Sequence, residues 1–86
     1  MYVLYVVRCA DATLYTGITV DISRRITEHN TSSKGARYTR SRRPVRLVYV
    51  KKYRTRSTAT KAELQFKQLS RNEKLQLIKQ AKRKAK

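Results

Sequence analysis

Residues 2–18 read YVLYVVRCADATLYTGI, and this stretch decides the fold. Its first six residues, YVLYVV, are β-branched, aliphatic or aromatic, which is typical of a buried strand. ADAT (10–13) supplies a turn, because the Asp11 side chain can hydrogen-bond the backbone two residues further on. LYTGI (14–18) predicts a second strand, so the two strands form an antiparallel hairpin. Gly17 inside that strand indicates either a bulge or a close approach of another group to the backbone.

The middle of the chain predicts a helix, a loop and a third strand. Asp21 has the position of an N-cap for a helix over about 22–30. Residues 30–44 are polar and basic and contain a glycine and a proline, which indicates a loop. VRLVYVKKY (45–53) predicts a strand that is apolar on both faces, and we therefore expect it at the centre of the sheet.

Two further helices are predicted near the end of the chain. One begins at Ser57 or Thr58, and the capping-box pattern from Ser70 to Glu73 opens the other. The predicted order is β-β-α-β-α-α. The sequence thus predicts an α+β fold in which helices flank a three-stranded sheet, as one domain over residues 1–86.

The charge balance indicates the class of partner. The chain has 22 Lys and Arg residues, five Asp and Glu residues and a formal net charge of +17. Between Glu28 and Glu63 there is no carboxylate but there are eleven basic residues. Such a stretch favours a polyanion, most often nucleic acid, over the alternatives of a solvated basic face or a membrane surface.

The single cysteine and the short apolar run at the N-terminus indicate the cellular compartment of the protein. Cys9 is the only cysteine, so it cannot form an intramolecular disulfide, and we expect it to be a small core residue. The apolar run before Arg8 is too short to span a bilayer. We therefore expect a cytoplasmic protein without a membrane segment.

The first helix brings three basic side chains into a defined arrangement. At 100° per residue, Arg25 and His29 share an arc with isoleucines that must face the protein, while Arg24 points to solvent. Arg25 suits bidentate phosphate recognition, or else covers apolar surface with its stem. His29 is either a proton carrier or phosphate contact, or a helix-end residue satisfied by local hydrogen bonds.

Two tyrosines and one glutamate complete the candidate site. Tyr5 and Tyr15 lie on paired strands and can be neighbours on one face, as a site or as ordinary sheet packing. Glu63 lies at the edge of a helical apolar stripe. It is a candidate metal ligand, with a capping box to Thr60 and an ion pair with Lys67 as alternatives.

Together these residues resemble the GIY-YIG endonuclease family, and in particular its small single-domain members. The resemblance extends from about residue 2 to about residue 80. It rests on these motifs and side chains: Val3-Leu4-Tyr5, Tyr15-Thr16-Gly17, Arg25, His29 and Glu63, with the stretches LYTGIT, RRITEHN, KGARYTR and KQLSR. Val3, Leu4 and Thr16 depart from the family's motif letters, while both motif tyrosines and Gly17 are kept.

The resemblance implies a metal-dependent endonuclease that hydrolyses phosphodiester bonds in DNA. By resemblance, Tyr5 and Tyr15 are the motif tyrosines, Arg25 is the active-site arginine, His29 is an auxiliary residue and Glu63 binds the metal. We expect water activated by a tyrosine, with help from His29, and a tyrosine pKa lowered by Arg25. One Mg²⁺ or Mn²⁺ on Glu63 would stabilise the leaving oxygen.

We expect the basic loop to follow the nucleic-acid backbone beside Gly17. Its candidate contacts are Lys34, Arg37, Tyr38, Arg40, Arg42 and Arg43. Backbone contacts give salt-dependent affinity without sequence preference, so selection by DNA structure, as in branched or damaged DNA, is expected. RNA, targeting by a protein partner and a non-catalytic nucleic-acid-binding module are the alternatives.

Overall fold

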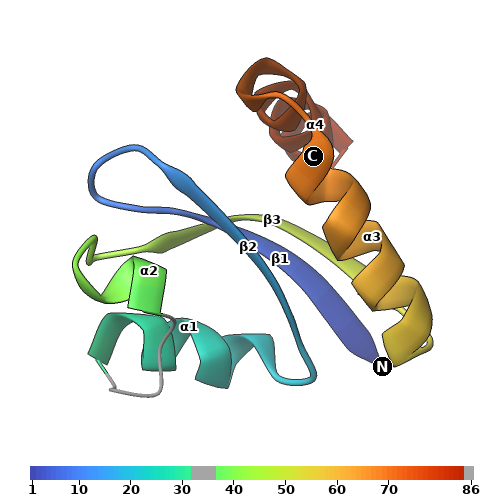
Figure 1. Cartoon of the computed structure of the whole chain (residues 1–86), viewed down its shortest axis with the longest axis horizontal. Helices are drawn as coiled ribbons and strands as arrows, with labels where there is room; N and C mark the ends of the chain where they lie inside the picture. The colour runs from blue at the N-terminus through green and yellow to red at the C-terminus, as the bar shows by residue number, and fades with distance from the viewer. Residues whose placement is uncertain (32–36, 85–86) are drawn as a thin grey trace.

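The computed structural model describes residues 1–31 and 37–84 and consists of a three-stranded antiparallel sheet flanked by helices (Figure 1). The elements are β1 (Tyr2–Arg8), β2 (Leu14–Thr19), α1 (Ile22–Thr31), α2 (Arg37–Arg40), β3 (Arg46–Tyr53), α3 (Arg56–Gln68) and α4 (Arg71–Lys84). The predicted α+β class and the order of strands and long helices are confirmed. α2 is an additional short helix inside the segment predicted as a loop. Across the described residues, no helix is long and apolar enough to cross a bilayer.

The strand order is β2-β1-β3, so the prediction that residues 45–53 form the central strand is wrong. β3 is an edge strand, and its Leu47 and Val50 side chains remain 39% and 42% exposed. The pairing of β1 with β3 shifts register once, which leaves Val48 as an extra residue. Because of this irregularity, Val48 and Tyr49 both pack against the same apolar cluster. The continuous apolar run in β3 therefore does not require that both faces of this strand are buried.

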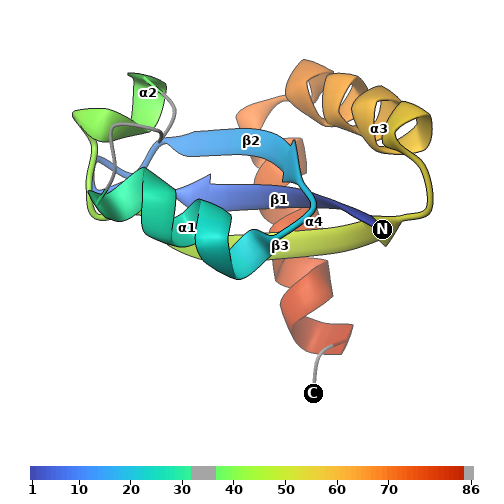
Figure 2. The same ribbon diagram turned by 90° about the horizontal axis from the view of Figure 1, so that it is seen from below.

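The central strand β1 carries core residues on both of its faces. The first buried cluster contains Tyr5, Val7, Cys9 and Val45, with α1 packed on it. The second buried cluster contains Val6, Phe66 and Ile78. α1 and α4 lie on opposite sides of the sheet (Figure 2). Cys9 is buried and free, as expected for a core residue.

Capping side chains determine where α1 and α3 begin. Oδ1 of Asp21 accepts a hydrogen bond from the backbone N–H of Arg24 at 3.0 Å, which confirms the predicted cap of α1. In α3, the Thr55 hydroxyl is the N-cap and accepts from the N–H of Thr58 at 3.2 Å. α3 therefore begins before the predicted start at Ser57 or Thr58.

The predicted capping box is present at the start of α4. The backbone N–H of Ser70 donates to the Glu73 carboxylate at 2.9 Å, and the N–H of Glu73 donates to the Ser70 hydroxyl at 3.2 Å. Hydrogen bonding of the Glu73 carboxylate to the backbone N–H and the hydroxyl of Ser70 lowers the pKa of Glu73 below its ordinary value. The Arg71 guanidinium donates to the backbone carbonyl of Ala12 at 2.8 Å, so the first turn of α4 is fixed to the β1–β2 hairpin turn.

Gly17 allows the Tyr5 side chain to cross strand β2. The two residues are directly opposite in the β1–β2 register. A Cβ atom at position 17 would lie 2.6 Å from the Tyr5 hydroxyl oxygen and 2.8 Å from Cζ. The predicted close approach to this glycine is therefore confirmed, and the approaching group is the Tyr5 ring. A contact of Gly17 with nucleic acid stays a prediction.

We expect Gly17→Ala to lower the free energy of unfolding by about 1–3 kcal/mol, because the added methyl group overlaps the Tyr5 ring. Denaturant unfolding measures this loss. The control is a double-mutant cycle with Tyr5→Phe, which removes the nearest clashing atom, so the double variant should lose less stability than the sum of the single variants. A Gly17→Ala protein as stable as the wild type would contradict this packing.

Candidate active site

Helix α1 directs its apolar residues and two of its basic residues to the same side. Ile22 and Ile26 pack against the sheet. His29 follows on this side and is 0% exposed. The Arg25 side chain is 25% exposed, whereas that of Arg24 is 62% exposed. The predicted helix phase, with Arg24 facing solvent, is confirmed.

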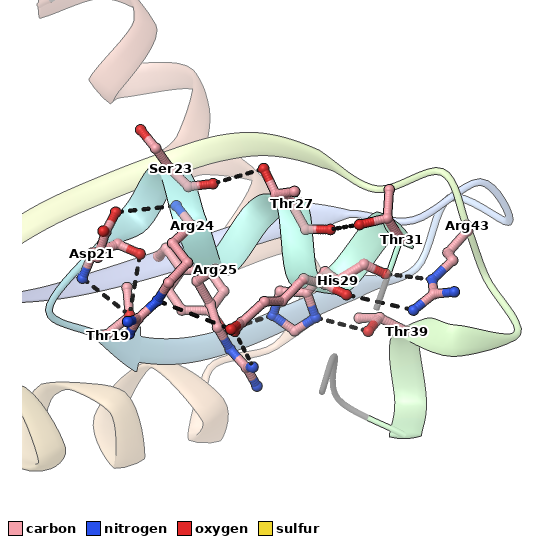
Figure 3. A network of polar contacts seen from close by, with 12 residues as sticks. Thr19, Asp21, Ser23, Arg24, Arg25, Thr27, His29, Thr31, Thr39 and Arg43 are labelled. Atoms are coloured by element: carbon pink, nitrogen blue, oxygen red, sulfur yellow. Dashed lines mark hydrogen bonds and ion pairs between the residues drawn. The ribbon is translucent and has the colours of Figure 1, made fainter. Parts of the chain in front are cut away.

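A chain of three buried side chains links the sheet, α1 and α2. The Tyr5 hydroxyl oxygen lies 2.8 Å from His29 Nε2, and His29 Nδ1 lies 2.8 Å from Thr39 Oγ1. Arg25 Nε donates to the same tyrosine oxygen at 3.4 Å. Figure 3 shows Arg25, His29 and Thr39 in this arrangement. Since Arg25 can only donate, the geometry fits a Tyr5 O–H that donates to Nε2 and a proton on Nδ1.

His29 is held as a neutral imidazole at neutral pH. Burial is the main cause that lowers its pKa from 6.5 to about 4. The charges of Arg25 and Arg43 contribute to this shift, and the charge of Glu28 opposes it. The alternative of local hydrogen bonds at a helix end is wrong, because the bonding partners of the ring lie on β1 and α2. His29 is thus a neutral bridge between two hydroxyl groups. Its catalytic role stays a prediction.

Tyr5 departs from the expectation that Arg25 lowers the pKa of a nearby tyrosine. Burial raises the pKa of Tyr5 and outweighs the hydrogen bond and the charge of Arg25, which lower it. The charges of Tyr15 and Glu63 raise it further. The expected downward shift is therefore wrong for Tyr5, because the phenolate would be desolvated at a side chain that is 1% exposed.

Arg25 is fixed by Glu28, a residue that the sequence analysis did not select. Arg25 Nη1 lies 3.0 Å from Glu28 Oε1, and the glutamate side chain is 20% exposed. Burial lowers the pKa of Arg25, but its hydrogen bonds to Tyr5 and Glu28 reverse this and leave the pKa raised. The i, i+3 spacing on a helix is the signal that could have identified Glu28. No such local spacing relates Thr39 to His29.

Tyr15 lies at the centre of an aromatic group beside His29. It is diagonal to Tyr5 on the paired strand, so the two predicted tyrosines share one face. The Tyr15 ring meets the His29 ring edge-on at 5.4 Å between centroids and stacks on Tyr38 at 5.9 Å. The Arg42 guanidinium lies 4.0 Å from the Tyr38 ring centroid, and Tyr38 remains 39% exposed. The group therefore extends from the buried histidine to the surface.

The basic residues predicted to contact nucleic acid fall into two groups. Arg37 and Arg40 are exposed on α2. Arg42 pairs with the carboxylate of the hairpin turn at 3.0 Å, and Arg43 donates to a backbone carbonyl near the end of α1. Lys34 lies outside the described residues. The nucleic-acid role of all five stays a prediction.

Glu63 lies on α3 as a half-buried carboxylate. Its side chain is 19% exposed and Lys67 Nζ lies 3.6 Å from Oε2, so the predicted ion pair is confirmed. The capping box with Thr60 is wrong, because Thr55 caps α3 and Thr60 lies inside the helix. The charge of Glu63 affects the pKa of Tyr5, which places this carboxylate within electrostatic range of the tyrosine hydroxyl.

The donor set around Glu63 fits only a cation that needs few protein ligands. Within residues 1–31 and 37–84, no three His, Cys, Asp or Glu side chains gather into a metal site. Magnesium often takes one or two carboxylates and fills its remaining positions with water and phosphate oxygens. The Lys67 side chain is 51% exposed, so its ammonium can move away from Glu63. A single divalent cation on Glu63 is therefore compatible with these residues.

Comparison with known proteins identifies the class. A family model described as "GIY-YIG catalytic domain" matches residues 1–76. The chain belongs to the GIY-YIG family, whose domain is in general that of an endonuclease. A UPF0213 protein of Desulfotalea psychrophila is 64% identical over 76 residues, covering 88% of this chain and 69% of that protein. One of Syntrophus aciditrophicus is 53% identical over 77 residues, covering 90% and 88%.

Two solution NMR structures have the same fold. The UPF0213 protein of Bacillus halodurans is 42% identical, with a TM-score of 0.59, and the match covers 92% of this chain and 84% of that chain. A protein of E. faecalis is 47% identical, with a TM-score of 0.63, covering 92% and 83%. The predicted resemblance to small GIY-YIG members is thereby confirmed.

We expect Thr39→Val to lower the free energy of unfolding by about 1–3 kcal/mol, because a buried ring nitrogen of His29 loses this partner. Thr39→Ser keeps the hydroxyl and should retain most of the stability. Denaturant unfolding of both variants measures the difference. A loss in Thr39→Ser without a loss in Thr39→Val would mean that the methyl group, and not the hydrogen bond, is what matters.

Stability should decrease with acid before the carboxylates titrate. The unfolded chain binds a proton at His29 near pH 6.5, but the folded chain does so only near pH 4. The stabilisation is complete above pH 6.5 and is lost as the pH falls toward 4, by up to about 3 kcal/mol. Denaturant unfolding between pH 7 and 5 measures this slope. His29→Gln, which removes the only histidine, should flatten the slope, and an unchanged slope would contradict the assignment.

Proposed function

We propose that the protein is a metal-dependent endonuclease that hydrolyses phosphodiester bonds in DNA. The observation that carries this proposal is the convergence of Tyr5, Arg25 and His29 in one hydrogen-bonded cluster. Tyr15 packs against this cluster and the charge of Glu63 reaches it. Phosphodiester hydrolysis needs a positioned phosphate, an activated water and stabilisation of developing charge. These side chains can supply each of these requirements.

Arg25 is the proposed phosphate clamp. Its side chain is 25% exposed, and its guanidinium is oriented by Tyr5 on one side and Glu28 on the other. A planar, permanently charged fork binds two phosphate oxygens at once, and partial burial reduces screening by water. A bound phosphate would take the place of the Glu28 carboxylate at Nη1.

We propose that Tyr15 accepts the proton of the attacking water, with Tyr5 as the alternative. The Tyr5 hydroxyl is buried, already engaged by two partners and raised in pKa, which makes its phenolate costly. Tyr15 is only partly buried. His29, neutral because its pKa is about 4, orients the Tyr5 hydroxyl and links it to α2. In this assignment His29 positions groups and does not store the proton.

Glu63 is the proposed ligand of one Mg²⁺ or Mn²⁺ ion. Such a cation, when bound, stabilises negative charge on the departing oxygen. The chain contributes a carboxylate that is held half-buried on α3, a helix that contacts both β1 and β2. In the absence of the cation, Lys67 forms an ion pair with the Glu63 carboxylate and compensates its negative charge.

The substrate is proposed to be selected by its shape. Arg37 and Arg40 on the exposed side of α2, together with Tyr38, would contact the sugar-phosphate backbone. Contacts of this kind carry affinity and salt dependence but no sequence information. Branched or damaged DNA is therefore the proposed substrate class, with RNA and targeting by a protein partner as alternatives.

One observation favours a second candidate function, a nucleic-acid-binding module without catalysis. Both charged groups of the site are already paired, Arg25 with Glu28 at 3.0 Å and Glu63 with Lys67 at 3.6 Å. A module that only binds needs neither pair to open. A nuclease needs both groups to exchange partners.

Cleavage of labelled branched, duplex and single-stranded DNA, with Mg²⁺, Mn²⁺ or EDTA, tests the proposal. We expect metal-dependent cutting that Glu63→Gln and Arg25→Ala each reduce by about 100-fold or more, with binding retained, because each removes charge stabilisation from the transition state. Arg24→Ala is the matched control, since it removes a neighbouring but exposed arginine, and it should cut normally.

Two outcomes would contradict this assignment. Tight binding without cutting in any metal would favour the non-catalytic module. Loss of cutting in Arg24→Ala but not in Arg25→Ala would mean that the clamp is placed on the wrong side of α1.

A further inference from the structure

Two arginines face each other across strands β1 and β3. Arg8 is directly opposite Arg46 in the antiparallel register. Side chains at such positions project from the same face, with Cβ atoms about 5 Å apart, and like charges there destabilise the sheet. Both side chains are exposed. Val7 and Cys9, the neighbours of Arg8, belong to the cluster under α1, so Arg8 projects from the opposite face.

The pair borders a surface hollow of about 630 Å³. The hollow is lined by Arg8, Cys9, Ala10, Pro44, Val45 and Arg46. It lies where β1 ends and β3 begins, at the end of the sheet away from α3 (Figure 1). The two guanidinium groups are the only charged groups in this lining, and the remaining four residues are apolar or small. The hollow is therefore open to a ligand that carries negative charge.

Among residues 1–31 and 37–84, no carboxylate forms an ion pair with either of these two arginines. The ion pairs formed between described side chains involve Arg24, Arg25, Arg42 and Lys67, and neither Arg8 nor Arg46 takes part. Asp11, the carboxylate nearest to Arg8 in the sequence, accepts from Thr13 at 2.6 Å and pairs with Arg42 at 3.0 Å. Within the described residues, the two arginines therefore have no carboxylate partner, and an anion from outside the chain can take that place.

We propose that Arg8 and Arg46 form a phosphate-binding site outside the Tyr5–Arg25–His29 cluster. Two guanidinium forks side by side match the oxygens of one phosphate group, and a bound anion would convert their repulsion into attraction. The net charge of +17 favours a nucleic-acid backbone as the source of this phosphate. In that form the inference rests on the proposed function, and the site holds a second segment of the substrate on the sheet face opposite α1.

Thermal unfolding tests the site without any use of nuclease activity. The proteins are the wild type, Arg8→Gln/Arg46→Gln and the matched control Lys52→Gln/Arg54→Gln, which removes two exposed cations at the other end of β3. Each is measured in millimolar pyrophosphate and in chloride of equal ionic strength. We expect pyrophosphate to raise Tm in the wild type and the control but much less in Arg8→Gln/Arg46→Gln. Equal rises in all three proteins would overturn the site.

The chloride measurement gives an independent check of the pair. Without a phosphate ligand, Arg8→Gln/Arg46→Gln should have a higher Tm than the wild type, because the repulsion across β1 and β3 is removed. A lower Tm in chloride, with no loss of the pyrophosphate response, would mean that the arginines have a structural role, and would also overturn the site.

Binding of an intact DNA duplex in EDTA, measured across a series of salt concentrations, identifies the source of the phosphate. If the site holds the backbone, Arg8→Gln/Arg46→Gln should make the dependence of log K on log salt shallower by about 1, because the two arginines together hold one phosphate group. An unchanged slope together with a lost pyrophosphate response would assign the site to a small phosphate anion. Failure of the chain to cut DNA would leave both readouts intact, so the nuclease proposal and this inference fail separately.

Discussion

The structure depends on one buried contact, the 2.8 Å hydrogen bond between the Tyr5 hydroxyl and His29 Nε2. Tyr5 belongs to the central strand, His29 to α1, and Thr39 joins the other ring nitrogen to α2. The tyrosine ring can cross β2 to reach the histidine only because residue 17 has no side chain. Among the described residues, no buried side-chain nitrogen or oxygen lacks a hydrogen-bond partner. A fully satisfied polar chain of this kind fixes α1 and α2 on the sheet.

Burial of this chain also determines where charge resides in the site. The pKa of His29 falls to about 4 and that of Tyr5 rises, so both groups are neutral near pH 7. Arg25 is permanently charged, and its hydrogen bonds to Tyr5 and Glu28 outweigh the effect of burial and raise its pKa. The cluster therefore combines neutral, rigid supports with one oriented cation. An anion that enters the site finds the guanidinium already positioned and has little to reorganise.

Local patterns in the sequence predicted the hairpin, the helix caps and the phase of α1. That phase placed Arg25 and His29 toward the sheet, because a helix of known start has a fixed periodicity. Local patterns could not place β3 at the edge, since an irregular register produces the same apolar run as a central strand. They could not identify Thr39, which meets His29 only through the tertiary fold. The direction of the Tyr5 pKa shift depends on burial, which no spacing rule measures.

The five carboxylates show how a chain of net charge +17 holds such a site together before a substrate arrives. Three of them stabilise a turn or a helix start: Asp11, Asp21 and Glu73. The remaining two form ion pairs: Glu28 with Arg25, and Glu63 with Lys67. In the proposed function a phosphate replaces Glu28 at Arg25, and a divalent cation replaces Lys67 at Glu63. Each internal partner has the same sign of charge as the group that would displace it. The unliganded protein can therefore keep both groups oriented without leaving a half-buried charge uncompensated.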